Sequence, residues 1–404
     1  MKQNFKKKVF PNGLTLVFEK RNLPVVSFIY AVRAGGLHEE LNEKGISHYI
    51  EHMLYKGTPK RNAFQIAKDI EKNGGEMNGF TSEEITGFWC KMPKESADLG
   101  LEVLTDLIKN PVFDENELKK ERKVIFEEMK MRRDSPQIYV LDKIQSFLYE
   151  GSLGEPLIGT EKTMNSLNRE KIVKKFKEIY NPSNLILCVV GNYDFNKLVR
   201  YLGKNFSGKG KTTTPQKIRL KNRKKIEERD GLDQANLVFA YHSPLSSDKR
   251  VYAAKVLSMI MTGGMSSRLF SEIREKRNLA YSVKGDLGAS KDYSYSFIYV
   301  GTTPEKIEEI KNLILDEFEK VSKELSREEL IQVKKQIIGN YQLSMEDTQS
   351  QMINLLSSEV SSKAEDFYNF QKEIEKVKLE EVKKLASEVK KGYSFFALVP
   401  KKNK

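Results

Sequence analysis

The chain of 404 residues is poor in cysteine, tryptophan and histidine, and it has no long apolar run. Its two cysteines, Cys90 and Cys188, lie inside apolar stretches, which argues against a disulfide framework and for a reducing compartment. Without roughly 18 consecutive apolar residues, no segment is expected to span a membrane. The basic N-terminus continues as alternating residues rather than an apolar core, so we expect no secretory signal and a cytoplasmic location.

The formal net charge of +13 raises the question of a nucleic-acid partner. The lysines are scattered, however, and they alternate with glutamate along predicted helices such as 114–123, as on solvated helix surfaces. The densest basic stretches, 209–225 and 401–404, lack the interleaved aromatic residues of a single-strand binding groove. We therefore expect no nucleic-acid partner.

The two halves of the chain repeat one order of predicted elements. Residues 92–108 correspond to 302–318, and residues 115–129 correspond to 327–341. An offset of roughly 210 residues between corresponding segments indicates two similar domains. Each half mixes hairpin-like strands with paired helices, so we predict an α+β fold in which each domain has an antiparallel-dominated sheet packed with helices.

A polar, basic segment rich in threonine and glycine separates the two halves. We therefore predict an N-terminal domain at 1–206, a linker at 207–225 and a homologous C-terminal domain at 226–404. The length of the chain suits two cores rather than one.

The stretch GISHYIEHMLYKGT contains two of the four histidines, four residues apart. Because a helix turns about 100° per residue, His48, Glu51 and His52 share one helix face. Two imidazoles at this spacing can ligate one ion, and the glutamate beside them can handle a proton. The alternative is an amphipathic helix whose histidines fall together by chance. The flanking apolar residues and the scarcity of histidine elsewhere favour the metal site.

A third metal ligand is expected on the predicted helix at 114–133. Its carboxylates at 121 and 128 lie within about 20° on one face but about 10 Å apart along the axis, so only one can reach the ion directly. The other would then orient a ligand histidine. Spacing alone does not choose between these two, and any single glutamate here could be an ordinary surface residue. The candidates are Glu115, Glu117, Glu121, Glu127 and Glu128.

The H-x-x-E-H motif, the following MLYKGT, and the segments EMNGFTSEEIT and ERKVIFEEM resemble the inverted-zincin metallopeptidases of the pitrilysin and insulinase (M16) family. The resemblance covers nearly the whole chain. It implies that Zn²⁺ is the cofactor, that Glu51 is the general base and that Asn78 helps to hold the substrate backbone. It further implies that the strand through Phe80 and Thr81 pairs with an extended peptide. The zinc ligands that it implies are His48, His52 and Glu128, with Glu121 orienting a ligand from behind.

The second half has no H-x-x-E-H, and Asn340 stands where the repeat would place a counterpart of Glu128. No second zinc site is therefore expected. The segment TGGMSSRLFSEIREKRNLAYSV instead resembles the second-domain signature of the same family, which implies that Arg274 and Tyr281 bind the substrate and stabilise the charge of the tetrahedral intermediate. The alternative is that Arg274 belongs to an ordinary exposed helix end. His38 and His242 have no partners at ligand spacing, so structural or surface roles are expected.

The resemblance implies a zinc-dependent endopeptidase or oligopeptidase with a zinc-bound water as nucleophile. A two-domain chain of this length is similar to the subunits of mitochondrial processing peptidase. It implies a homodimer that encloses peptides or unfolded segments in a chamber, with Arg274 and Tyr281 of one subunit completing the zinc site of the other. The alternatives are a heterodimer with a related chain and a non-catalytic partner subunit. Neither the substrate nor the metal in the cell follows from the sequence, because the same ligands accept cobalt or manganese.

Overall fold

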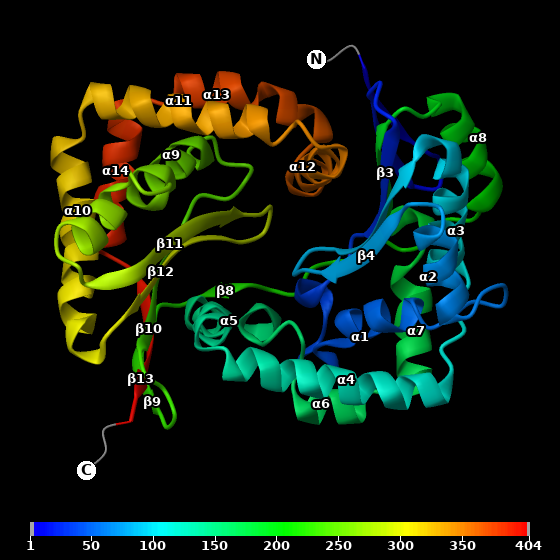
Figure 1. Ribbon diagram of the computed structural model, residues 1–404, viewed down its shortest axis with the longest axis horizontal. Helices are drawn as coiled ribbons and strands as arrows, with labels where there is room; N and C mark the ends of the chain where they lie inside the picture. The colour runs from blue at the N-terminus through cyan, green and yellow to red at the C-terminus, as the bar shows by residue number, and fades with distance from the viewer. Residues whose placement is uncertain (1–3, 402–404) are drawn as a thin grey trace. The chain divides into compact units, whose positions relative to one another are not determined.

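The computed structural model describes residues 4–401, which form two compact units. Unit 1 comprises the residues up to 129 together with 155–217 and 344–368, and unit 2 comprises the remainder. Each unit contains one larger β-sheet with helices packed against it (Figure 1). The predicted α+β fold class, with an antiparallel-dominated sheet in each half, is confirmed. Among the described residues, no helix combines the length and the apolarity that crossing a membrane requires.

The sheet of unit 1 has six strands in the order β1-β2-β7-β3-β5-β4, and only the pair of β2 and β7 is parallel. The strands are β1 (Phe5–Val9), β2 (Thr15–Lys20), β3 (Val25–Val32), β4 (Glu76–Thr81), β5 (Thr86–Pro93) and β7 (Leu185–Gly191). The α-helices are α1 (Ile46–Leu54), α2 (Ala63–Glu71), α3 (Ala97–Lys109), α6 (Glu161–Ser166), α7 (Arg169–Ile179), α8 (Phe195–Asn205) and α12 (Thr348–Ser361). Strand β4 therefore forms one edge of this sheet.

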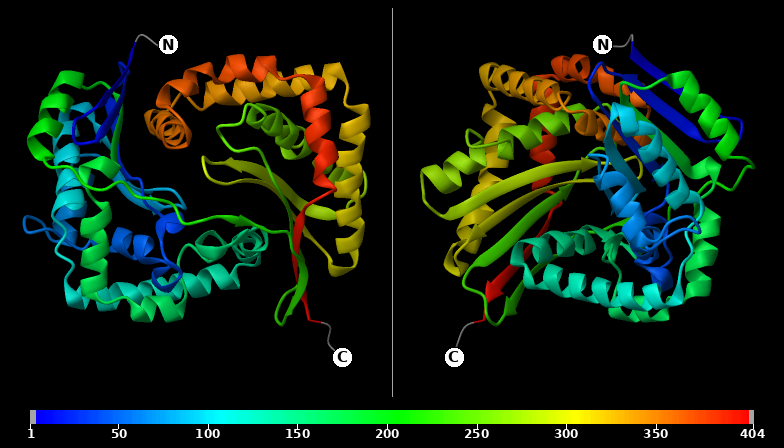
Figure 2. Two further views of the ribbon diagram at one scale, coloured as in Figure 1. Left: turned by 180° about the vertical axis from the view of Figure 1, so that it is seen from behind. Right: turned by 45° about the vertical axis from the view of Figure 1, so that its right-hand side comes forward.

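The main sheet of unit 2 has five strands in the order β11-β12-β10-β13-β9, and only the pair of β13 and β9 is parallel. Helix α11 runs beside α13, and α10 runs beside α14 (Figure 2). The strands are β9 (Lys224–Arg229), β10 (Ala235–His242), β11 (Ala280–Ala289), β12 (Ser294–Thr302) and β13 (Ser394–Pro400), with a separate pair β6 (Tyr149–Glu150) and β8 (Arg219–Leu220). The α-helices are α5 (Pro136–Leu148), α9 (Val251–Thr262), α10 (Ile307–Glu324), α11 (Arg327–Leu343), α13 (Phe370–Lys376) and α14 (Leu379–Val389).

The two sequence halves exchange one helix each. Helix α4 (Glu115–Asp134) begins in unit 1, and the next helix, α5, packs on β10 and β13 of unit 2. The corresponding long helix of the second half, α11, lies in unit 2, and the helix that follows it, α12, packs on β3 and β7 of unit 1. The chain passes between the units several times, and one of these passages, at 217–218, falls within the predicted linker. The reciprocal exchange itself was not predicted from the sequence.

Helix α12 covers strands whose residues are buried on both faces. Every residue of β7 is buried, as is nearly every residue of β3, which explains why both strands are predominantly apolar. The contact with α12 is nevertheless partly polar. Ser27 and Thr348 join their hydroxyl groups at 2.8 Å, and the Gln351 amide donates to Glu19 at 2.7 Å. Lys7 forms an ion pair of 2.6 Å with Glu359. These bonds fix the position of α12 on the sheet, because buried polar groups need defined partners.

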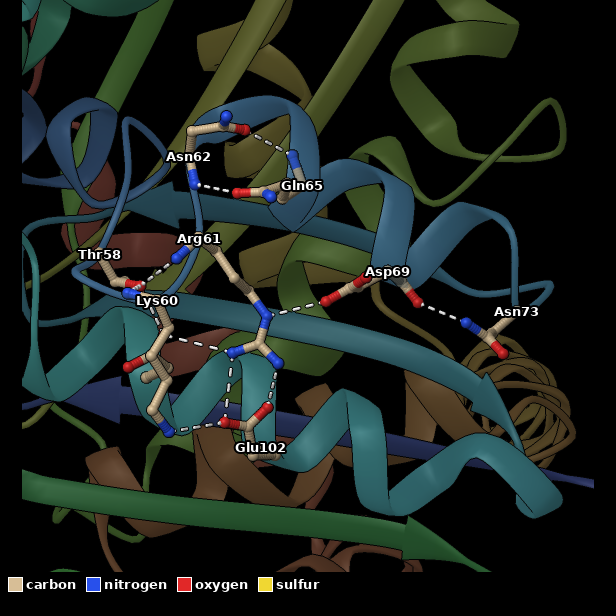
Figure 3. A network of polar contacts seen from close by, with 9 residues as sticks. Thr58, Lys60, Arg61, Asn62, Gln65, Asp69, Asn73 and Glu102 are labelled. Atoms are coloured by element: carbon tan, nitrogen blue, oxygen red, sulfur yellow. Dashed lines mark hydrogen bonds and ion pairs between the residues drawn. The ribbon is translucent and has the colours of Figure 1, made fainter.

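The loop that leaves the C-terminal end of α1 is fixed by Arg61 (Figure 3). The guanidinium group donates to Asp69 of α2 at 2.8 Å, and it forms ion pairs with Glu102 and Asp106 of α3. The hydroxyl group of Thr58 also donates to Asp106, at 2.6 Å. Arg61 therefore joins the loop to two helices at once, and its side chain is only 14% exposed.

We predict that Arg61→Met lowers the free energy of unfolding of unit 1 by about 2 to 4 kcal/mol, because it leaves partly buried carboxylates without their cation. The matched control is Lys60→Met. Lys60 also pairs with Glu102, but its side chain is 64% exposed, so its loss should cost less than about 1 kcal/mol. Urea unfolding followed by the fluorescence of Trp89, the only tryptophan, measures both variants. Equal losses for the two variants would contradict the assigned role of Arg61.

Candidate metal centre

Helix α1 is buried on one face and carries the H-x-x-E-H motif on the other. Its apolar side chains, Ile46, Ile50 and Met53 among them, belong to the core of unit 1. The hydroxyl group of Tyr49 donates to the backbone carbonyl of Leu118, which ties α1 to α4. The amphipathic pattern in the sequence therefore forms the expected helix, and it leaves the two histidines and the glutamate only partly buried.

The structure brings Glu128 of α4 to the Nε2 atoms of both histidines. Its Oε2 atom lies 3.5 Å from Nε2 of His48 and 3.8 Å from Nε2 of His52. One ligand atom from each of the three residues lies within 4.8 Å of the others, and no further cluster of this kind occurs in residues 4–401. Ligands about 2.1 Å from a tetrahedral ion are roughly 3.4 Å apart, so this set of two imidazoles and one carboxylate fits zinc.

Glu121 lies behind His52 rather than beside Glu128. Its Oε2 atom accepts a hydrogen bond of 3.0 Å from Nδ1 of His52, and its Oε1 atom lies 2.5 Å from Nζ of Lys56. A proton on Nδ1 leaves the lone pair of Nε2 free for a metal. The glutamate is only 7% exposed. The two carboxylates that spacing could not separate therefore occupy different places, and Lys56 joins the site as a residue that was not predicted.

The side chain of Glu51 connects α1 to the edge strand β4. Its Oε2 atom accepts a hydrogen bond of 2.6 Å from Oγ1 of Thr81. Burial raises the pKa of Glu51, and the hydrogen bond from Thr81 opposes this effect. The carboxyl group is thus held at a fixed place beside the two histidines, in surroundings that favour taking up a proton.

Strand β4 pairs with β5 on one side only, so its other edge can accept an extended chain. Asn78 is exposed on this strand, and its Oδ1 atom accepts the N–H of Gly79 at 2.8 Å. The ring of Phe80 lies against Gly87. A side chain at Gly79 would start 2.6 Å from the hydroxyl oxygen of Tyr55 and 3.1 Å from the backbone carbonyl oxygen of Gly87, so glycine at this position lets the strand lie close to Tyr55.

Arg274 and Tyr281 lie in unit 2, on two irregular pieces of backbone. Arg274 belongs to a π-helical turn at Phe270–Glu275, and its guanidinium carbon lies 5.0 Å from the ring centre of Phe270. Tyr281 is 51% exposed and sits at a β-bulge near the start of β11, with its ring against Gly301. Helical and strand periodicity predicts neither irregularity. Both kinds of distortion recur at functional sites.

The basic residues around Arg274 differ from it in their contacts. Arg268 pairs with Glu329, whereas Lys276 and Arg277 both pair with Glu272. Among the described residues, Arg274 forms no ion pair.

The remaining histidines bond to the backbone. Nδ1 of His38 accepts from the N–H of residue 35 at 3.3 Å, and Nε2 of His242 donates to the carbonyl of residue 221 at 3.1 Å.

The chain is similar to known proteins over most of its length. A family model described as insulinase (peptidase family M16) matches residues 16–161, and one described as the peptidase M16 inactive domain matches residues 166–337. An uncharacterized zinc protease of Bacillus subtilis is 34% identical over 84% of this chain and 84% of its own length. One of Rickettsia felis is 34% identical over 86% and 85%. The crystal structure of a protease from Helicobacter pylori covers 98% of this chain and 99% of its own, with a TM-score of 0.91 and 23% identity.

We predict that Glu121→Gln weakens zinc binding about 10- to 100-fold, because the amide holds Nδ1 of His52 less firmly. Glu128→Gln should weaken it at least as much. Glu127→Gln is the matched control on the same helix and should leave the affinity unchanged, because Glu127 is not in the ligand cluster. Competition with a chelator of known affinity measures all three. An equal loss in the Glu127 and Glu128 variants would contradict the assignment.

Proposed function

Because the chain belongs to the M16 insulinase family, we propose that it is a zinc-dependent endopeptidase or oligopeptidase. The observation that carries the proposal is the convergence of three candidate ligand atoms from His48, His52 and Glu128 beside a partly buried glutamate and an open strand edge. Each of these parts has a separate task in peptide hydrolysis, and all of them lie in unit 1.

Zinc held by His48, His52 and Glu128 would supply a Lewis acid and a water molecule of lowered pKa. Glu51 takes the proton of the attacking water and later delivers it to the leaving amine. The hydrogen bond from Thr81 keeps its carboxyl group in place during both transfers. Arg274 and Tyr281 donate hydrogen bonds to the substrate and to the developing negative charge. This role is supported by the resemblance and by the absence of an ion pair of Arg274 within residues 4–401.

The substrate class follows from the edge of β4. A peptide that adds to this edge forms main-chain hydrogen bonds and must be extended over several residues. Asn78 is exposed beside that edge and helps to hold the peptide backbone. Peptides and unfolded segments meet this condition, whereas the interior of a folded protein does not. The two cysteines are free and buried, which agrees with action in a reducing, cytoplasmic setting.

We further propose a homodimer in which Arg274 and Tyr281 of one subunit complete the metal centre of the other. The resemblance to two-domain members of the family and the exposure of Tyr281 support this arrangement. A heterodimer with a related chain would use the same residues. No nucleic acid or membrane is part of the proposal.

A non-catalytic partner subunit is the second candidate. It is favoured by the description of the C-terminal family model as an inactive domain and by Asn340, which stands where a glutamate ligand would be needed. The first half, however, keeps every residue that the zinc chemistry requires. Peptide hydrolysis by the isolated chain separates the two candidates.

We predict that zinc-loaded wild-type protein cleaves a quenched library of unstructured peptides, and that Glu51→Gln lowers kcat about 10²- to 10⁴-fold at equal zinc content, because the amide cannot take a proton. Glu127→Gln is the control for loss of one carboxylate and should retain activity. Fluorescence release measures the rates, and metal analysis measures the zinc. Equal inactivity of wild type and Glu51→Gln with zinc bound would favour the partner-subunit function.

We predict that mixing inactive Glu51→Gln protein with inactive Arg274→Ala protein restores activity, because a mixed dimer contains one site with both groups intact. The recovered rate should approach about a quarter of the wild-type rate when equal amounts exchange freely, since half of the dimers are mixed and each has one working site. Differently tagged subunits measure the exchange. Demonstrated exchange without recovered activity would show that Arg274 does not act on the partner's site.

A further inference from the structure

A lysine and two glutamates are buried together at the N-terminal end of α1. The side chains of Lys44, Glu39 and Glu83 are 1%, 2% and 9% exposed. Nζ of Lys44 lies 3.7 Å from Glu39 and 3.6 Å from Glu83, and it donates to the carbonyl of Gly36 at 2.8 Å. Charged side chains are rarely buried to this degree unless they are paired. We call these three residues the buried ion cluster.

Glu39 caps the metal-binding helix from outside it. Its Oε2 atom accepts the N–H of Gly45 at 2.9 Å, and its Oε1 atom accepts the N–H of Ser47 at 2.7 Å. Gly45 has a φ of +92°, so the chain turns sharply into α1 and offers no capping side chain of its own. A carboxylate at a helix N-terminus also interacts favourably with the helix dipole. Glu39 therefore fixes the first turn of α1 immediately before His48.

Glu83 lies in the turn that follows strand β4, two residues after Thr81. The backbone before α1 lies directly against this turn: the N–H of Gly36 donates to Ser82 at 3.1 Å, and that of Leu37 donates to Glu83 at 2.8 Å. A side chain at Gly35 would start 2.1 Å from the backbone carbonyl oxygen of Ser82. The close approach thus requires glycine, and Lys44 lies between the cap of α1 and the end of β4.

Stability alone is a poor explanation for this cluster. Removing three charges from water costs several kcal/mol per ion, and apolar residues of similar volume often serve a buried position as well. Ion pairs and hydrogen bonds, unlike apolar contacts, fix the orientation of the two groups that they join. The orientation of α1 relative to β4 matters here, because Glu51 lies on α1 and accepts a hydrogen bond from Thr81 on β4. A displacement of about 1 Å between catalytic group and substrate can lower a rate 10²-fold.

We propose that Lys44, Glu39 and Glu83 are positioning residues that hold α1, and with it Glu51, at a fixed place relative to the peptide on β4. The inference rests on the proposed peptidase function. It assigns the cluster no contact with substrate or metal. The charges act through the backbone at the start of α1 and at the end of β4.

Glu83→Gln is the most direct test, because it leaves Glu39 and Lys44 as a neutral pair and so should not unfold the protein. The expected result is a loss in kcat of about tenfold, with KM and the zinc dissociation constant each within about twofold of wild type. Glu84→Gln, in the same turn but outside the cluster, is the matched control and should keep the wild-type kcat. A merely structural role would instead lower activity together with zinc content and melting temperature.

A double-mutant cycle extends the test to Lys44. Lys44→Met in the Glu83→Gln protein should lower kcat little further, because the link is already broken, whereas independent effects would multiply. Should Lys44→Met prevent folding, Glu83→Gln alone decides. An unchanged kcat in folded, zinc-loaded Glu83→Gln protein overturns the proposal.

Failure of the peptidase function is distinguished by hydrogen exchange. Wild-type protein that binds zinc but cleaves no peptide would refute the function. The positioning role is then judged by amide exchange in Glu83→Gln, which should quicken at 46–54 and 76–81 together and remain unchanged in α2. Unchanged exchange in both segments would overturn the positioning role by itself.

Discussion

The contact between α1 and α4 is the interaction on which the candidate metal centre depends. His48 and His52 lie on α1 and Glu128 lies on α4, so neither helix carries the candidate ligand set by itself. Tyr49 bonds to the backbone of α4 on the buried side, and His52 bonds to Glu121 on the open side. Lys56 lies next to Glu121, and it belongs to the same loop as Arg61. The candidate ligands are therefore positioned by the contacts between α1 and α4, while Arg61 attaches the loop that follows α1 to α2 and α3.

The sequence was most informative where a residue pattern has only a few geometric solutions. Histidines four apart must share a helix face, and in the structure His48, Glu51 and His52 all lie on the partly exposed side of α1. Glutamates seven apart also share a face, but spacing does not say at which height along α4 the other helix crosses. The contact near Leu118 places Glu121 against Nδ1 of His52, and Glu128 lies two helical turns further along α4. The point at which α1 contacts α4 depends on the tertiary structure. Periodicity therefore could not tell which carboxylate faces the ion and which faces His52, and only the resemblance distinguished them.

Other parts of the site have no signature in a single sequence. A π-helical turn at Phe270–Glu275 and a β-bulge at Tyr281 each depart from the residue period of a regular helix or strand. Hydrophobic patterns in the sequence indicate only regular helices and strands. The buried charges of Lys44 and Glu39 appear in the sequence as ordinary surface residues, because EELNEKG is a polar segment. A glycine pair before such a segment, together with a helix start that lacks a capping side chain, is the one signal that could have indicated a close approach.

The reciprocal exchange of α5 and α12 limits how far the duplicated halves can be treated as independent domains. Strands β3 and β7 are apolar on both faces, so the first half needs a cover on its outer face, and the helix that supplies it comes from the second half. A purely apolar contact would allow α12 to slide along the sheet. The bonds from Gln351 to Glu19 and from Lys7 to Glu359 define one position, at the cost of burying charge. Because α5 performs the same service for β10 and β13, each half completes its core only when the other is present. The second half, which lacks the H-x-x-E-H motif, therefore contributes a helix to the core of the first half, which carries the motif.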